Sequence, residues 1–307
     1  MNSNVYRTMA FLALLLSMNM SWADAAEKNW YMKMDISALA GSSSGSVERD
    51  GLTSFSLFLA ADYLERGGLV AGYNRTSISF RNSGGDIDQD QLYLSGRYSL
   101  TPDWAAGRIS LRLDGYAIDN NDPGEGTGDL RIAAPQISYM NFKKTFYVDI
   151  GYATSSYGTS SNVAGDLDVT QWTPTVGFGF NESRDWVQLR TYVIDLSNAE
   201  RAQGEDSTAA LEIKWTHWFD GAGLLGMDNI RLSGLVGERL YAVDPDAAVV
   251  YNLADIQTGG FTLGGEWALN ERSSILLQFG LEQYEDRTID DSYNNGYVYL
   301  NFGHQFK

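Results

Sequence analysis

Residues 296–307, GYVYLNFGHQFK, end the chain on a strand pattern. Val298, Leu300 and Phe302 occupy every second position, and Phe306 returns to the same alternation just before the last residue. Apolar residues at alternate positions give a β-strand one apolar face and one polar face. Chain ends that are not tied into the structure are usually frayed. We therefore expect this end to be a structural strand.

The same alternation recurs along the whole chain. Clear examples are residues 55–63, 109–115, 146–152 and 275–281. The pattern predicts an all-β chain of about 14 strands (12–16). The expected strands begin near positions 30, 53, 69, 90, 108, 130, 145, 168, 186, 208, 229, 256, 273 and 293.

The connections between these strands alternate in length, which separates two β architectures. GSSSGSVERDG (41–51) is long and ERGG (65–68) is short; IDNNDPGEGTGD (118–129) is again long, and AVDPDAAVVYN (242–252) and EDRTIDDSYNNG (285–296) belong with the long set. Short turns at one end and long loops at the other are typical of an antiparallel up-and-down transmembrane β-barrel. A soluble sandwich with crossover connections is the alternative, and it has no reason to alternate in this way.

Tryptophan placement favours the membrane barrel. Five tryptophans lie beside the expected short turns, and indole rings prefer the boundary between membrane and water. They are Trp30, Trp104, Trp186, Trp218 and Trp267. The pattern predicts an aromatic girdle at one rim.

The start of the chain and its composition indicate the compartment. Residues 1–25 contain Arg7, a short apolar run and the triplet Ala23-Asp24-Ala25, which together predict a cleaved signal peptide. Residues 26–307 would then form a single barrel domain. There are no cysteines, which excludes disulfides and thiol chemistry, and no later apolar run is long enough for a membrane helix. The net charge of −17 argues against nucleic acid as a partner.

With these residues in view, the chain resembles Gram-negative outer-membrane β-barrel proteins. It is similar in length to monomeric porins of the OmpG type, and a YaiO-like barrel is a second candidate. The resemblance implies a bacterial outer-membrane location and a last strand that the barrel-assembly machinery recognises. It assigns this signal to Val298, Leu300, Phe302 and Phe306, although Lys307 follows the terminal aromatic residue and His304 occupies a position that is usually aromatic.

The sequence gives little support for an enzyme. Barrel enzymes of this membrane depend on a histidine as base. The chain has His217 and His304, and both fall on the expected outward face near the short turns. The stretch Asp86-Ile87-Asp88-Gln89-Asp90 lacks the glycine and glutamate of an EF-hand loop, because Gln91 and Arg97 occupy those positions. We therefore expect no catalytic residues, no metal site and no cofactor.

Charged residues on the expected inner face are the candidate site. The candidates for lining the lumen are Arg97, Arg112, Asp114, Arg131, Asp149, Arg190 and Arg231. Such a mixed lining either borders a water-filled channel or braces the wall by ion pairs. The long connections carry many more acidic than basic residues, which would favour cations at the mouth.

These patterns lead to two functional hypotheses. The first is a passive, weakly cation-preferring pore for small solutes. The second is a non-conducting structural, adhesive or export-associated barrel that acts through its long acidic loops. Both place the chain among outer-membrane lipid and lipopolysaccharide.

Overall fold

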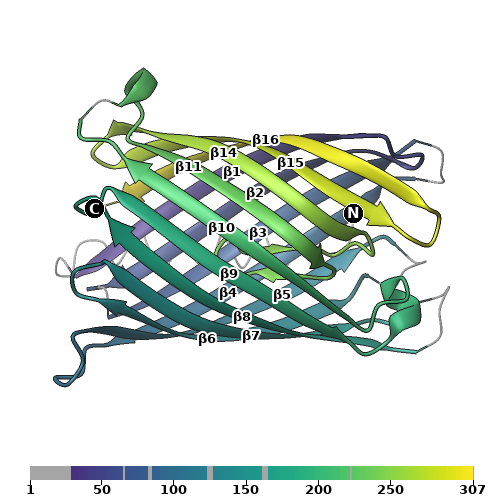
Figure 1. Cartoon of the computed structure of the whole chain (residues 1–307), viewed down its shortest axis with the longest axis horizontal. Coiled ribbons are helices and arrows are strands. Elements are labelled where there is room, and N and C mark those ends of the chain that lie inside the picture. The colour runs from purple at the N-terminus through teal and green to yellow at the C-terminus, as the bar shows by residue number, and fades with distance from the viewer. Residues whose placement is uncertain are drawn as a thin grey trace, which may run out of the picture.

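The computed structural model describes residues 29–64, 66–81, 85–122, 127–160, 165–221 and 223–306. The expected signal peptide at 1–25 lies outside the described residues. The described part forms a closed antiparallel barrel of fourteen strands (Figure 1). In chain order the wall consists of β1 (Trp30–Ser44), β2 (Arg49–Tyr63), β3 (Gly67–Phe80), β4 (Ile87–Leu100), β5 (Gly107–Asn120), β6 (Leu130–Asn141), β7 (Phe146–Tyr157), β8 (Leu167–Phe180), β9 (Asp185–Leu196), β10 (Ser207–Trp218), β11 (Asn229–Arg239), β14 (Ile256–Asn270), β15 (Ser273–Asp286) and β16 (Asp291–Phe306).

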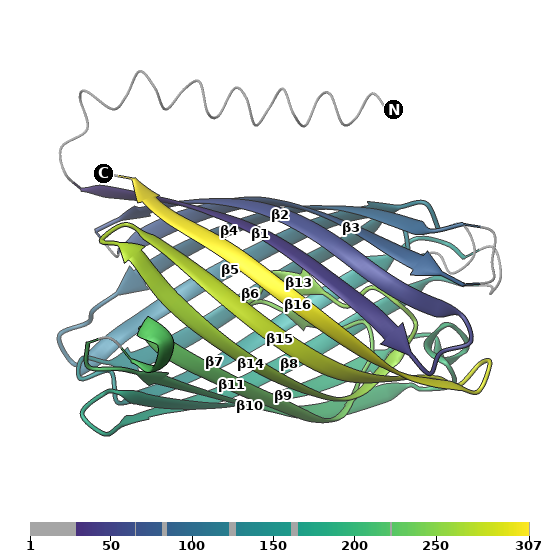
Figure 2. The same cartoon turned by 90° about the horizontal axis from the view of Figure 1, so that it is seen from above.

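The last strand closes the barrel against the first. β1 and β16 pair from Met32↔Phe306 to Ser44↔Asn294 (Figure 2). Closure satisfies the backbone groups of both terminal strands, which is the condition for a sheet to exist in lipid. The all-β barrel and its strand number are thus confirmed, and each expected strand start lies within 4 residues of the observed one.

Alternation distributes the side chains between lipid and lumen. Large apolar residues such as Leu94, Leu113 and Leu281 are exposed on the outer surface. Polar residues of the opposite register, such as Ser95 and Asp114, are buried inside. This apolar-out, polar-in arrangement is the one that a membrane barrel requires.

The strands run further than the loop pattern suggested. β1 and β2 stay paired to Ser42↔Gly51, so residues 45–48 alone connect them. β15 and β16 are paired to Asp286↔Asp291. The expectation of long loops at these two places is wrong, because polar residues continue the backbone ladder beyond the expected strand ends.

The tryptophan girdle is only partly as expected. Trp30 and Trp267 lie on the outward register near the end with short turns, and Trp104 is exposed in the turn between β4 and β5. The ring of Trp186 instead turns inward and lies against Gly177, where an added Cβ would come within 2.4 Å of the indole. Trp186 therefore packs inside the barrel.

Two short 3₁₀ helices and one small hairpin complete the described part. These are η1 (Ala199–Ala202), η2 (Leu224–Gly226) and the pair β12 (Val243–Asp244) and β13 (Val249–Val250). Neither helix in this part has the length or apolar character needed to cross a membrane.

Candidate functional site: a loop folded into the barrel

The connection between β11 and β14, residues 240–255, folds into the lumen (Figure 2). We call it the inner loop. Its core is the β12–β13 hairpin, in which Val243 pairs with Val250 and Asp244 with Val249. The sequence pattern placed residues 242–252 among the outer loops, and this expectation is wrong: Tyr241, Ala242 and Val243 are fully buried.

A bulge at the end of β11 turns the chain inward. The register between β11 and β14 shifts between Val236 and Arg239. Gly237 within the bulge has φ +97°, and a Cβ there would lie 2.5 Å from the carbonyl oxygen of Ala209. Both features require glycine, and bulges of this kind redirect a strand. Tyr241 then donates a hydrogen bond of 2.9 Å to the carbonyl oxygen of Arg201.

Apolar packing holds the base of the inner loop. The inner faces of β5 to β9 carry buried apolar residues toward the outer end of the barrel, among them Ile118, Leu130 and Ile194. Tyr241 packs on Tyr157 with ring centroids 4.9 Å apart. This apolar cluster includes residues of the wall and of the inner loop, so the loop shares a core with the barrel.

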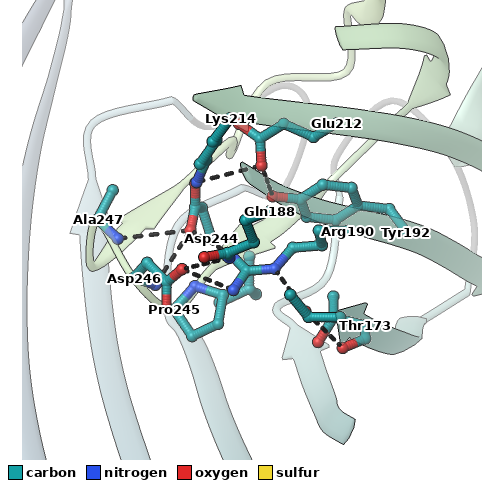
Figure 3. A network of polar contacts seen from close by, with 12 residues as sticks. Thr173, Gln188, Arg190, Tyr192, Glu212, Lys214, Asp244, Pro245, Asp246 and Ala247 are labelled. Carbon is teal, nitrogen blue, oxygen red and sulfur yellow. Dashed lines mark hydrogen bonds and ion pairs between the residues drawn. The ribbon is translucent and has the colours of Figure 1, made fainter. Parts of the chain in front are cut away.

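Arg190 holds the tip of the inner loop (Figure 3). Its guanidinium group contacts Asp244 at 3.2 Å and Asp246 at 2.6 Å, and it donates to the hydroxyl of Thr175 at 3.1 Å. The side chain of Arg190 is 1% exposed. A guanidinium group with several donors in a fixed plane suits such a shared contact.

Asp244 is a buried carboxylate of the loop that is surrounded by cationic groups. Its carboxylate accepts the backbone N–H of Asp246 at 3.0 Å and lies 3.6 Å from the Lys214 ammonium group. Burial raises the pKa of the Asp244 carboxyl, but the cationic groups of Lys214, Arg190 and Arg239 outweigh it and hold this pKa below its usual range. Asp244 therefore stays ionised at neutral pH.

Side-chain amides and Arg112 bind the backbone of the hairpin. Gln171 donates to the carbonyl oxygen of Val243 at 2.7 Å and accepts its N–H at 3.0 Å, as a paired strand would. Arg112 donates to the carbonyl oxygen of Pro245 at 2.6 Å, and Gln91 donates to that of Ala248 at 2.9 Å. Buried backbone groups of the loop thus find partners in the wall.

The far end of the loop is tied to another part of the wall. Asp255 lies 2.9 Å from Arg49 and accepts the hydroxyl of Tyr293 at 2.7 Å. The guanidinium carbon of Arg239 lies 3.8 Å from the centroid of the Tyr251 ring, which is a cation–π contact.

The structure brings three of the predicted lining residues to the inner loop. Arg112 and Arg190 bind it directly. Asp114 forms an ion pair with Arg112, with 2.6 Å between its carboxylate and the guanidinium group. Arg97 lies apart from this group and pairs with Asp62 at 2.5 Å. Arg231, also apart, contacts Glu266.

Asp149 lies on the inner register of β7 and is buried. The side chain of Tyr147, two residues earlier on the same face of β7, is its neighbour there.

Arg131 is not a lining residue. Its neighbours Leu130 and Ile132 are buried inside the barrel, whereas Arg131 occupies the outward register of β6 with Ile137. Its side chain is 59% exposed and pairs with Asp129 at 2.8 Å. The expectation fails because β6 begins with a buried leucine, so the charged residue after it falls on the outer face.

Several residues of the site were not predicted. Gln171 is a neutral amide, and it stands among other uncharged polar residues in its strand. Asp244 and Asp246 resembled the other acidic loop residues. The signal that distinguishes this loop is its apolar content, because Val243, Val249 and Val250 stand within it.

The two histidines lie on the outer register. His217 shares a hydrogen bond with Asp185 at 2.9 Å, and His304 shares one with the hydroxyl of Ser273 at 2.9 Å. Within the described ranges, no group of three or more His, Cys, Asp or Glu residues could hold a metal ion. In the acidic stretch 86–90, Asp88 and Asp90 pair with Arg75 at 3.0 and 3.6 Å.

The residues of the expected assembly signal lie on the outward register of β16. Val298, Leu300 and Phe306 are exposed on the outer surface. Phe302 pairs in register with Ile36 of β1 and Ile275 of β15. All four positions thus belong to the closing strand.

No protein-family model matches the chain, and no curated protein matches it. Solved structures share its fold. A bacterial polysaccharide outer-membrane secretin aligns with a TM-score of 0.55 and 11% identity over 90% of this chain and 98% of that one. The toluene transporter TodX of Pseudomonas putida aligns with a TM-score of 0.51 and 11% identity over 91% of this chain and 90% of that one. The chain thus shares the closed-barrel fold of these two outer-membrane proteins.

Proposed function

We propose that the chain forms a pore in the bacterial outer membrane that passes small solutes passively and weakly prefers cations. The observation that carries this proposal is the inner loop, which is held inside a closed barrel by charged groups. A loop held in this way narrows the lumen at a defined level, which is how a wide barrel becomes selective by size.

The passage would run along the wall that faces away from the tip of the inner loop. The tip takes its partners from β4, β5 and β8 to β10. The inner face of β2 and β3 instead carries small polar groups: Asn74 donates to the hydroxyls of Ser54 at 2.8 Å and Ser56 at 2.7 Å. Hydroxyl and amide groups suit hydrated solutes.

The weak cation preference rests on the charge of the outer end. Among the described residues there, Asp119, Asp166 and Glu200 add negative charge, while Arg131 and Arg287 are already paired with acidic groups. An acidic mouth raises the local concentration of cations.

Single-channel conductance of residues 26–307 in a planar bilayer tests the proposal. We expect steady openings, and a reversal potential whose sign shows that cations pass more readily than anions. A matched variant with residues 242–251 replaced by a short Gly-Ser linker should conduct more in each opening, because the barrel wall remains and the obstruction is removed. Folded protein that inserts and stays silent in both forms would contradict the pore.

A second function is favoured by the apolar cluster. Part of the lumen is packed by buried residues such as Tyr192, Val169 and Val243, as a core is packed. This supports a non-conducting envelope barrel that acts through its outer loops. In that case the wild-type protein stays silent in the bilayer and only the linker variant conducts.

The proposed outer-membrane location also implies two partners, lipopolysaccharide and the barrel-assembly machinery. Lipopolysaccharide would surround the outer loops, and the barrel-assembly machinery would bind the last strand through Val298, Leu300, Phe302 and Phe306. Replacing Phe306 with alanine should slow assembly in vesicles that contain the machinery more than it slows unassisted folding. Equal effects on the two rates would contradict recognition at this residue.

A further inference from the structure

The connection between β10 and β11 forms a lobe on the outside of the barrel wall. We call residues 219–221 and 223–228 the side lobe; it contains η2. Figure 1 shows η2 standing out sideways from the wall, and Figures 1 and 2 both place it short of the barrel end along the long axis. The side lobe therefore extends into the space that the membrane would occupy beside the wall.

The side lobe packs on the lipid-facing surface of β14. Met227 is buried and lies over Gly265, where an added Cβ would come within 2.3 Å of its sulfur. The indole N–H of Trp267 donates to the carbonyl oxygen of Leu225 at 3.1 Å. Gly265 and Trp267 share the outward register with Phe261. The side lobe is thus continuous with the apolar outer surface.

The tip of the side lobe is apolar and exposed. Leu224 is 65% exposed and Leu225 is 82% exposed. Leu225 has φ +55°, a left-handed conformation that favours glycine. Gly226 follows with φ +76°, so a tight turn of two left-handed residues presents the Leu225 side chain at the tip. The charge lies at the base instead, where Asp220 pairs with Arg184 at 2.8 Å.

We propose that Leu224 and Leu225 insert into the periplasmic leaflet of the outer membrane and anchor the barrel to its phospholipids. The assignment of the leaflet rests on the proposed outer-membrane location. The neighbouring Trp267 supports it, because an indole with a satisfied N–H is favoured at the membrane–water boundary. An apolar tip over a charged base is the arrangement of an interfacial anchor.

The absence of cysteine allows a single-site test. Leu225→Cys and, as the matched control, Glu182→Cys are labelled with the environment-sensitive dye NBD. Glu182 lies in another turn at the same end and its side chain is 89% exposed. The labelled proteins are folded into vesicles of phosphatidylethanolamine and phosphatidylglycerol, and heat-modifiable migration on gels confirms that each is folded.

We expect the dye at position 225 to emit at shorter wavelength, to lose quenching by iodide and to be quenched by spin-labelled phospholipid. The dye at position 182 should show the reverse. Iodide quenching at 225 equal to that at 182 would overturn the anchor. Protection from both quenchers would also overturn it and would point to a protein partner such as a second copy. These readouts do not depend on conductance, so a silent barrel leaves this test intact.

Discussion

Arg190 is the residue on which the tip of the inner loop depends most. Replacing it with alanine leaves the Asp244 carboxylate buried without its closest cation. Breaking a buried ion pair costs about 3–5 kcal/mol, and we expect about 3 because Asp246 is partly exposed. The inner loop should detach from the barrel wall. This would raise single-channel conductance and expose residues 244–248 to protease.

The control for this change is Arg131→Ala. Arg131 was expected in the lumen but lies on the outer register, so its loss should leave conductance and protease resistance as in the wild type. Equal effects of the two alanine variants would contradict the placement of both arginines.

Asp244 determines how the loop responds to acid. The pKa of Asp244 is lower in the folded protein than in the unfolded chain. Its carboxylate therefore stabilises the wall-bound inner loop fully above about pH 4, which is the ordinary pKa of an aspartate. That contribution is lost as the pH falls through the depressed folded pKa. Conductance should therefore be constant from pH 7 to about pH 4 and change only in stronger acid. A transition near pH 6 would show that another group controls the loop.

Two prolines interrupt the backbone hydrogen bonding between neighbouring wall strands. Paired residues are missing between β8 and β9 around Pro174 and between β6 and β7 around Pro135. Proline has no N–H to donate, which interrupts the ladder at these positions.

Pro174→Val should restore one backbone hydrogen bond to β9 and stabilise the barrel by about 1 kcal/mol. Urea unfolding in lipid vesicles, followed by gel migration, measures this. Thr170→Val on the same outward register of β8, where the ladder is intact, is the control and should change stability less. A destabilised Pro174→Val barrel would indicate that the interruption itself fits the packing around Gly151 and Thr173.

The elements differ in how far the sequence predicts them. A wall strand is encoded locally, because alternation within ten residues and the turns on either side decide both its existence and its faces. The inner loop depends on residues far away in the chain, such as Gln171 for Val243 and Arg112 for Pro245. No local pattern contains those pairs, so Arg112 and Arg190 were predicted as inner residues but their common partner was not.

At the scale of the whole molecule, the charge at the outer end should control selectivity through long-range electrostatics. The Debye length is about 10 Å at 0.1 M salt and about 3 Å at 1 M. Cation preference should therefore be measurable in dilute salt and disappear near 1 M, as shown by reversal potentials across a fixed gradient. A preference that persists in concentrated salt would indicate that charges inside the lumen, close to the passing ion, decide selectivity.

The ladder between β1 and β16 has a consequence for the order of the strands. Because Met32 faces Phe306, the first and last wall strands meet within one continuous wall. The wall is then a closed ring, and any of its strands could be the first in the chain. A linker could join β16 to β1, and the chain could begin and end at another short turn instead. Circularly permuted chains, joined at this seam and opened elsewhere, would build the same cylinder.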